Sequence, residues 1–190
     1  MTHKKIVILK GSPREKGNSA ILAERVADGA RSAGAEISSF YLHSMDIRPC
    51  DACEACHENG GKPCIIEDDM QKIYSAIDQA DVILIASPIY WFWLSAQTKL
   101  CIDRFYAYAG KKPNMLAQKI FALVFVFGDS DVYTSGGINA IRSFEDMCRY
   151  LGAPIGGILY GSADEAGDIL KQEDLLNKAY QFGKKLGASH

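Results

Sequence analysis

The sequence predicts an α/β fold: a three-layer doubly wound sandwich built on a five-stranded parallel sheet with strand order 2-1-3-4-5. First, apolar runs of strand length alternate five times with segments of helical periodicity. Second, the run at 82–86 is apolar at every position, which is typical of a central parallel strand covered on both faces. Third, a six-stranded dinucleotide-binding sheet would need more chain than these 190 residues.

The first three predicted strands lie in the N-terminal half. Residues 6–9 form an apolar run that ends before a Gly-Ser-Pro turn, and residues 36–42 form the second strand. A helix is expected at 18–33 and another at 69–80, because apolar residues recur at helical spacing in both. The third strand is 82–86. Residues 43–67 show no clear period, so we expect one domain over 1–190 with a cysteine-rich insertion at about 43–67.

The C-terminal half continues the alternation. A helix is expected at 94–108, a fourth strand at 120–127, a helix at 137–151, a short strand at 155–159 and a closing helix at 169–186. Ligands of such sheets bind beyond the carboxyl ends of the strands, near the point where the strand order reverses. The loops after strands one, three and four should therefore carry the function.

Composition excludes several classes of protein. The net charge of −2 gives no electrostatic reason to bind nucleic acid or an anionic membrane. No apolar run approaches the roughly 20 residues that a membrane-spanning helix needs. The short apolar run near the N-terminus is not expected to be a signal peptide, because no small-residue cleavage site follows. We expect a cytoplasmic protein whose thiols stay reduced, which argues against disulfides.

The loop after the first strand is typical of a phosphate site. Glycines and polar residues precede a helix, whose first backbone N–H groups lack intrahelical partners and carry the positive end of the helix dipole. Ser12, Asn18 and Ser19 can donate hydrogen bonds, and Arg14 can pair with phosphate charge. A plain loop with Asn18 or Ser19 as helix cap is the alternative. Neither a P-loop nor a G-x-G-x-x-G run is present, which favours a mononucleotide.

The loops after strands three and four suggest a site for a flat ligand. Four aromatic residues at 90–93 follow the buried third strand and could form an apolar wall; a hydrophobic plug or a subunit contact is the alternative. The loop after strand four is long, polar and contains glycine, a composition that is common in loops.

Together these loops resemble the flavodoxin-like NAD(P)H-dependent FMN reductase superfamily over essentially the whole chain. The resemblance is carried by the segments "GSPREKGNSAILAERV" and "ASPIYWFWLSAQTKLCIDRF". The segment "CDACEACHENGGKPCIIEDDM" resembles the iron–sulfur flavoprotein branch. The sequence "FGDSDVYTSGG" departs from the short Thr/Ser-Gly-Gly turn that is commonest in these reductases.

The resemblance implies FMN as cofactor and NAD(P)H as substrate. The FMN phosphate would lie against Ser12, Arg14, Asn18 and Ser19. The ring system would lie against Pro88, Ile89, Tyr90 and Trp91, flanked by Gly128 and Asp129.

Electrons would pass from NAD(P)H or a protein donor to FMN and then to a small-molecule or protein acceptor, with a [4Fe–4S] cluster as a further carrier where one is bound. Hydride would go from the nicotinamide to FMN, with no side chain acting as acid or base. A homodimer or homotetramer is also implied. The alternatives are a cluster-free NAD(P)H:FMN or quinone reductase and a non-catalytic flavodoxin-type electron carrier.

Four cysteines, Cys50, Cys53, Cys56 and Cys64, follow the spacing C-x2-C-x2-C-x7-C. Four thiolates are what a [4Fe–4S] cluster usually requires. Zinc also accepts four thiolates, and free or redox-active thiols are the third alternative. All three stay open.

Asp68 and Asp69 are expected to act as cap and first-turn acids of the next helix, and Asp103 and Arg104 as a structural ion pair or a subunit contact.

Overall fold

A parallel sheet forms the centre of the computed structural model, which describes residues 3–58, 64–109 and 114–188. Its strand order is β2-β1-β3-β5-β6, so the predicted fold class is confirmed. A short strand, β4, is an addition that the sequence did not predict, and it pairs antiparallel with the end of β3. The strands are β1 (Lys5–Lys10), β2 (Glu36–Tyr41), β3 (Val82–Tyr90), β4 (Trp93–Leu94), β5 (Ile120–Phe127) and β6 (Ile155–Ser162).

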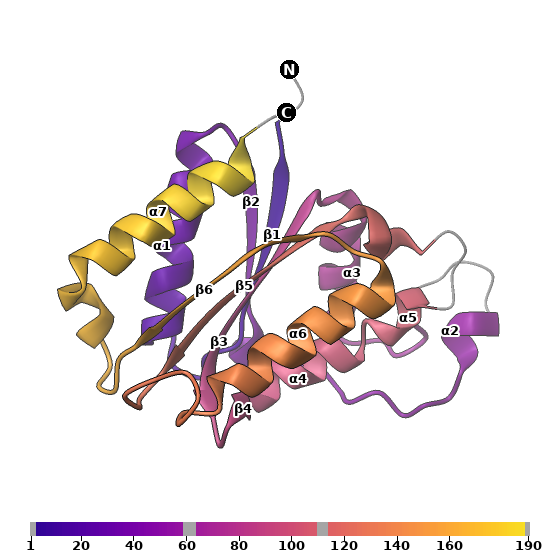
Figure 1. The fold of residues 1–190 in the computed structure, drawn as a ribbon. Coiled ribbons are helices and arrows are strands. Elements are labelled where there is room, and N and C mark those ends of the chain that lie inside the picture. Colours follow the sequence, from indigo (N-terminus) through magenta and orange to yellow (C-terminus); the bar gives the residue numbers. More distant parts are fainter. Residues whose placement is uncertain (1–2, 59–63, 110–113, 189–190) are drawn as a thin grey trace.

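Helices cover both faces of the sheet (Figure 1). One layer consists of α1 (Asn18–Ser32) and α7 (Glu173–Gly187), and the other of α3 (Met70–Gln79), α4 (Ala96–Asp103) and α6 (Gly137–Leu151). The carboxyl ends of the parallel strands lie at the lower end of Figure 1, where β4 is also found. The short helical segments are α2 (Ala55–Glu58), α5 (Tyr106–Ala109), η1 (Leu42–Ser44), η2 (Met115–Gln118) and η3 (Asp168–Lys171).

The core has two halves because successive residues of a strand point to opposite faces of the sheet. Ile6 and Ile8 pack in the half under α1 and α7, whereas Val7 and Leu9 pack in the half under α3, α4 and α6. All four are at most 2% exposed. This two-sided burial explains why the strands are apolar at consecutive positions.

Some predicted boundaries were wrong. The strand predicted at 82–86 is β3, which continues to Tyr90, and the strand predicted at 155–159 is β6, which continues to Ser162. The helix predicted at 94–108 is broken between Asp103 and Tyr106, where Arg104 turns its side chain into the interior. The last helix begins at Glu173, because the 3₁₀ turn η3 occupies the preceding residues.

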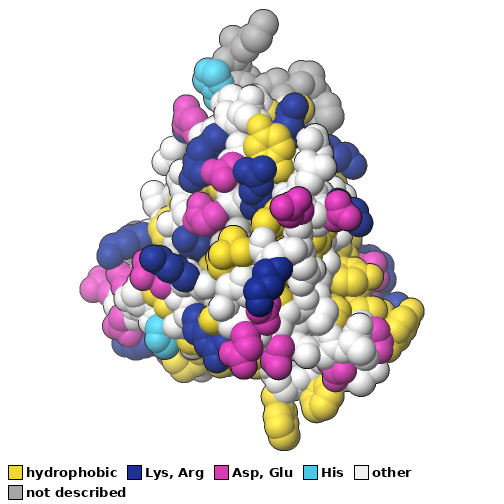
Figure 2. Space-filling model, turned by 90° about the vertical axis from the view of Figure 1, so that its left-hand side faces the viewer, with side chains coloured by type: hydrophobic (Ala, Val, Ile, Leu, Met, Phe, Trp, Pro, Cys, Tyr) yellow, Lys and Arg dark blue, Asp and Glu magenta, His cyan; other side chains and the backbone are white. Residues whose placement is uncertain are grey.

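The face formed by α1 and α7 carries acidic and basic side chains side by side, without a large patch of one sign (Figure 2). Hydrophobic side chains project from the lower end of this view, the end of the molecule that carries β4 in Figure 1. None of the helices in the described ranges is long and apolar enough to cross a membrane.

The two helices of this layer approach each other backbone to backbone. A Cβ atom built on Gly183 would lie 1.8 Å from the carbonyl oxygen of Val26, and one built on Gly29 would lie 1.9 Å from that of Tyr180. Neither position has room for a side chain. Glycine is therefore required here by close packing.

We predict that Gly183→Ala destabilises the protein by about 1–3 kcal/mol, because the new methyl group would push the two backbones apart. Helix propensity alone predicts the opposite, a gain of about 0.8–1 kcal/mol. Urea unfolding measures the difference, with Gln181→Ala at an exposed position of the same helix as the control. A Gly183→Ala protein as stable as the wild type would contradict the packing argument.

Candidate functional site

The ends of β1 and β3 are fastened together by buried hydroxyl groups. The Gly11 N–H donates to the carbonyl of Ala86 at 2.8 Å, and the Ser95 Oγ donates to the carbonyl of Gly11 at 2.6 Å. The Ser95 N–H in turn donates to the Ser87 Oγ at 3.0 Å, and the Thr98 N–H to the Ser95 Oγ at 3.3 Å, which caps α4. Ser87, Ser95 and Thr98 are at most 1% exposed. The first loop, the third strand and α4 are thus fixed relative to one another.

A first cavity of about 320 Å³ opens at this edge of the sheet. Its walls come from the loop after β1 with the start of α1, from the ends of β3 and β5, and from the loops after β5 and β6. The structure brings together here most of the residues predicted for FMN, namely Ser12, Arg14, Asn18, Ser19, Pro88, Ile89, Tyr90 and Gly128.

The first loop is closely packed against the start of α1. The Ser12 Oγ donates to the Arg14 carbonyl at 2.9 Å and accepts from the Arg14 N–H at 3.0 Å. Tyr41 at the end of β2 donates to the carbonyl of Pro13 at 2.8 Å. A Cβ atom on Gly17 would lie 2.6 Å from the Ser12 Oγ, so any larger residue would displace this hydroxyl group. These contacts preform the loop around a helix N-terminus that suits an anion.

Asn18 has a role that the sequence did not suggest. Its amide nitrogen donates to the carbonyls of Ala163 and Glu165 at 3.2 and 2.8 Å. Its Oδ1 accepts from the N–H groups of Gly167 and Ile169 at 2.9 and 3.3 Å. The side chain therefore ties the loop after β6 to α1. Its amide hydrogens are committed to these carbonyls, so a phosphate would meet the backbone N–H of Asn18 instead of the side chain.

The aromatic segment is a hairpin and not an irregular loop. Tyr90 pairs with Trp93, and the two residues between them, Trp91 and Phe92, have φ angles of 50° and 67°. Two left-handed residues define a type I′ turn, which normally carries Asn-Gly. The tip is held by the Asn139 amide, which donates to the Phe92 carbonyl at 3.3 Å, and by close contact of that backbone with Gly136. Trp91 itself is 92% exposed.

A second cavity of about 280 Å³ adjoins the first. The two cavities share Ile89, Phe127, Gly128 and Asp164. Trp91 and Asp129, which were predicted to bind the flavin ring, line this second cavity together with Phe92 and Ser135. Asp164, which lines both, was missed because it follows an edge strand whose loop carries no recognisable motif.

The loop after β5 is organised by Asp131. Its carboxylate accepts hydrogen bonds from the backbone N–H and hydroxyl of Thr134 and from the N–H of Tyr133, at 2.7 to 3.0 Å. These donors, those of Thr134 first, lower the pKa of Asp131 to about 2. This contribution to loop order is present above the ordinary carboxyl pKa and is lost as the pH falls towards 2.

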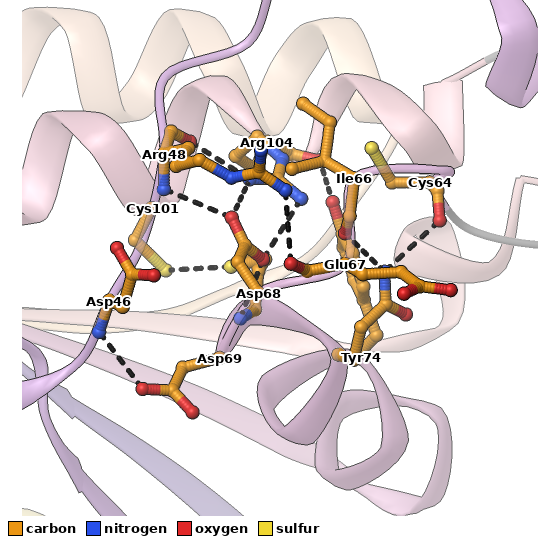
Figure 3. Close-up of polar contacts among 12 residues, drawn as sticks. Asp46, Arg48, Cys64, Ile66, Glu67, Asp68, Asp69, Tyr74, Cys101 and Arg104 are labelled. Atoms are coloured by element: carbon orange, nitrogen blue, oxygen red, sulfur yellow. Dashed lines mark hydrogen bonds and ion pairs between the residues drawn. The ribbon is translucent and has the colours of Figure 1, made fainter.

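The base of the cysteine segment is a closed stem (Figure 3). Asp46 and Asp69 exchange hydrogen bonds, since the Asp69 N–H donates to the Asp46 carbonyl and the Asp46 N–H to the Asp69 carboxylate, both at 2.9 Å. Arg48 donates from its side chain to the carbonyl of Glu67 at 3.0 Å. The segment that leads to Cys50 and the segment that follows Cys64 are therefore joined to each other by hydrogen bonds.

A buried ion pair holds this stem to the rest of the protein (Figure 3). Arg104 Nη1 lies 2.5 Å from the Asp68 carboxylate and donates to the Arg48 carbonyl at 2.8 Å, and the charged side chains are at most 1% exposed. Burial alone would raise the pKa of Asp68, but hydrogen bonds from Arg104, Arg48 and Met70 lower it below its ordinary value. The Arg104 Nε has no hydrogen-bond partner among the described residues. Asp68 is thus an interior counterion more than a helix cap, and the predicted partner Asp103 pairs with Lys99 instead.

The cysteines themselves do not form a metal site in this structure. Cys50 and Cys53 are exposed, and Cys56 and Cys64 are partly buried, none of them in a disulfide. Within the described ranges, no three Cys, His, Asp or Glu side chains lie together as metal ligands would. Residues 59–63, between Cys56 and Cys64, lie outside these ranges.

A second contact anchors the middle of the cysteine segment. The Tyr106 hydroxyl donates to the Glu54 carboxylate at 3.0 Å, and the rings of His57 and Tyr106 lie 4.5 Å apart. Ala52 and Glu54 both have positive φ angles, of 56° and 60°. The segment is therefore docked on α5 as well as on Arg104.

We predict that Arg104→Met destabilises the protein by about 3–5 kcal/mol, because it leaves the charge of the buried Asp68 carboxylate without its counterion. The double variant Asp68→Asn, Arg104→Met should recover much of this loss, since neither buried charge remains. Chemical denaturation of the single and double variants measures the coupling.

Lys99→Met is the matched control, because it breaks an exposed ion pair on α4, the helix that directly precedes Arg104, and should cost less than about 1 kcal/mol. An Arg104→Met protein no less stable than Lys99→Met would show that the buried pair does not hold the stem.

Comparison with known proteins gives consistent results. Residues 4–167 match the family model described as NADPH-dependent FMN reductase. The chain is 29% identical to the NAD(P)H-dependent FMN-containing oxidoreductase YwqN of Bacillus subtilis, over 97% of this chain and 99% of that one. It is 30% identical to an iron–sulfur flavoprotein of Methanosarcina thermophila, over 85% of each chain. A solved NAD(P)H:quinone oxidoreductase from Methanothermobacter marburgensis has a similar fold, with a TM-score of 0.76, 22% identity and coverage of 100% and 98%.

Proposed function

The chain belongs to the NADPH-dependent FMN reductase family, and we propose that it binds FMN in the first of the two adjoining cavities and passes electrons from NAD(P)H to an acceptor. The observation that carries this proposal is the first cavity. It combines Ser12, Arg14 and the N-terminus of α1 at one end with the backbone of Pro88, Ile89 and Tyr90 at the other. A phosphate and a flat ring need these two environments.

Each end of the cavity has a distinct task in this proposal. Arg14 and the first N–H groups of α1 bind the phosphate, while Gly17 keeps the loop close enough for the backbone to reach it. The backbone at the end of β3 and Gly128 orient the ring. FMN supplies the hydride and one-electron chemistry. The protein supplies position and electrostatics, and no side chain is assigned the role of acid or base.

Stopped-flow mixing of FMN-loaded protein with NADPH under anaerobic conditions tests the reductase function. We expect the flavin absorbance to bleach in a phase whose rate rises with NADPH concentration, because a reductase accepts hydride directly. NADH in place of NADPH measures the preference between the two nucleotides. A flavodoxin-type carrier would keep its FMN oxidised in both mixtures, and that result would reject the proposal.

The phosphate site is tested by comparing FMN with riboflavin, which lacks the phosphate. We predict that Arg14→Met weakens FMN binding about tenfold, as expected for the loss of one charge-assisted contact, and leaves riboflavin binding unchanged. Lys16→Met is the control, because this exposed cation of the same loop does not line the cavity. Titration by flavin fluorescence gives the constants. An equal loss of affinity for FMN and for riboflavin would show that Arg14 does not contact the phosphate.

We also propose that the four cysteines bind a [4Fe–4S] cluster. Their number and spacing and the name of the Methanosarcina relative support this. The donor set suits a cluster, but the described side chains do not converge as ligands, so no electron-transfer step is assigned to it. Zinc and free thiols remain the alternatives.

Iron and acid-labile sulfide in anaerobically purified protein decide between these ligands. A cluster predicts about four irons per chain and a broad absorbance bleached by dithionite. Cys53→Ser should then lose iron while keeping FMN, because Cys53 lies outside both cavities. Iron-free protein that reduces FMN at the full rate would reject the cluster.

A further inference from the structure

We propose that the second cavity selects electron acceptors by charge, with Asp164 as the specificity-determining residue. It would take flat acceptors that are neutral or cationic and disfavour anionic ones. This inference rests on the proposed function, because it assigns a substrate class to the same site.

The two cavities differ in the charges that line them. The first contains Arg14 beside the N-terminus of α1, which suits an anion, and it shares only Asp164 of the two acidic residues discussed here. The second contains the carboxylates Asp129 and Asp164, and no Lys or Arg among the described residues that line it. One end of the continuous cleft therefore favours negative charge, and the other end opposes it.

Of the two carboxylates, Asp164 is the one whose negative charge is less offset by neighbouring donors. Asp129 accepts a hydrogen bond from the Ser130 N–H at 2.7 Å, which offsets part of its charge. For Asp164, no described residue donates a hydrogen bond to its carboxylate or forms an ion pair with it. Its Oδ1 lies 2.8 Å from where a Cβ atom on Gly128 would be, so the carboxylate rests against the backbone shared by both cavities. A ligand in either cavity would therefore lie near this charge.

The apolar walls of the second cavity fit the same class of acceptor. Trp91, Phe92 and Phe127 supply aromatic surface for a flat molecule. Aromatic faces attract cations, and neighbouring carboxylates strengthen that preference. A neutral ring gains the stacking without the electrostatic penalty, whereas an anion would meet two carboxylates.

Reoxidation by a quinone provides a balanced reaction for the test. Two electrons and two protons pass from reduced FMN to one quinone, which yields oxidised FMN and the hydroquinone. NADPH and one solvent proton supply them in the preceding half-reaction, which releases NADP⁺. Charge on the quinone then affects its approach to the site and not the stoichiometry.

The experiment compares naphthoquinone, its sulfonate and a trimethylammonium-substituted naphthoquinone as oxidants of the reduced FMN-loaded protein. The protein is photoreduced with EDTA as the sacrificial electron donor, so the result does not depend on NADPH. Stopped-flow spectroscopy gives the second-order rate constant for each quinone. At low salt, Asp164→Asn should raise the ratio of the sulfonate's rate constant to that of the neutral quinone about three- to tenfold. It should lower the corresponding ratio for the cationic quinone. Both changes are expected because the lost negative charge repels the anion and attracts the cation. High salt should reduce both changes.

Glu165→Gln is the matched control. It removes the same charge from the next residue, which is exposed and does not line either cavity. Comparing variants with the same three quinones cancels the differences in their reduction potentials. Ratios that are unchanged in Asp164→Asn, or changed equally in Glu165→Gln, would overturn the inference. If NADPH failed to reduce the protein while the ratios shifted as expected, the proposed hydride donor would be wrong and the charge selection would stand.

Discussion

The hydroxyl network between β1 and β3 is the constraint on which the site depends. Gly11 is held from both sides, through its N–H by Ala86 and through its carbonyl by Ser95. Since Ser95 also caps α4, one set of buried hydrogen bonds fixes the loop after β1, the end of the central strand β3 and α4, the helix that directly precedes Arg104. A shift at this junction would move both cavities and the cysteine stem together. Such networks are rigid when every member has a partner.

Much of the fold and the first cavity could be predicted from sequence because the signals were local. Buried parallel strands produce uninterrupted apolar runs, and ligands of this class of sheet bind at a known edge. The residues predicted for FMN therefore came together without any knowledge of distances. The hairpin at the end of β3 was hidden, because Trp and Phe are not the residues that a type I′ turn normally shows.

The remaining features depend on pairs that are distant in the sequence. Arg104 and Asp68 are 36 positions apart, and an arginine within a helical pattern is expected at the surface. Asn18 is of a residue type that commonly caps helices, yet the hydrogen-bond partners of its side chain lie about 145 to 151 positions away in the sequence. Asp164 lies in no recognisable motif and is identified as a candidate site residue only by the cavity that it lines. No periodicity or spacing rule could have identified these contacts.

The left-handed backbone at Trp91 and Phe92 has a consequence for protein engineering. Each such residue costs about 1–2 kcal/mol relative to glycine, so standard rules for thermostabilisation would replace this pair with Asn-Gly first. That replacement would relax the turn and remove two aromatic walls of the second cavity. A site where such rules would improve heat resistance is therefore part of the aromatic surface that is proposed to receive the electron acceptor.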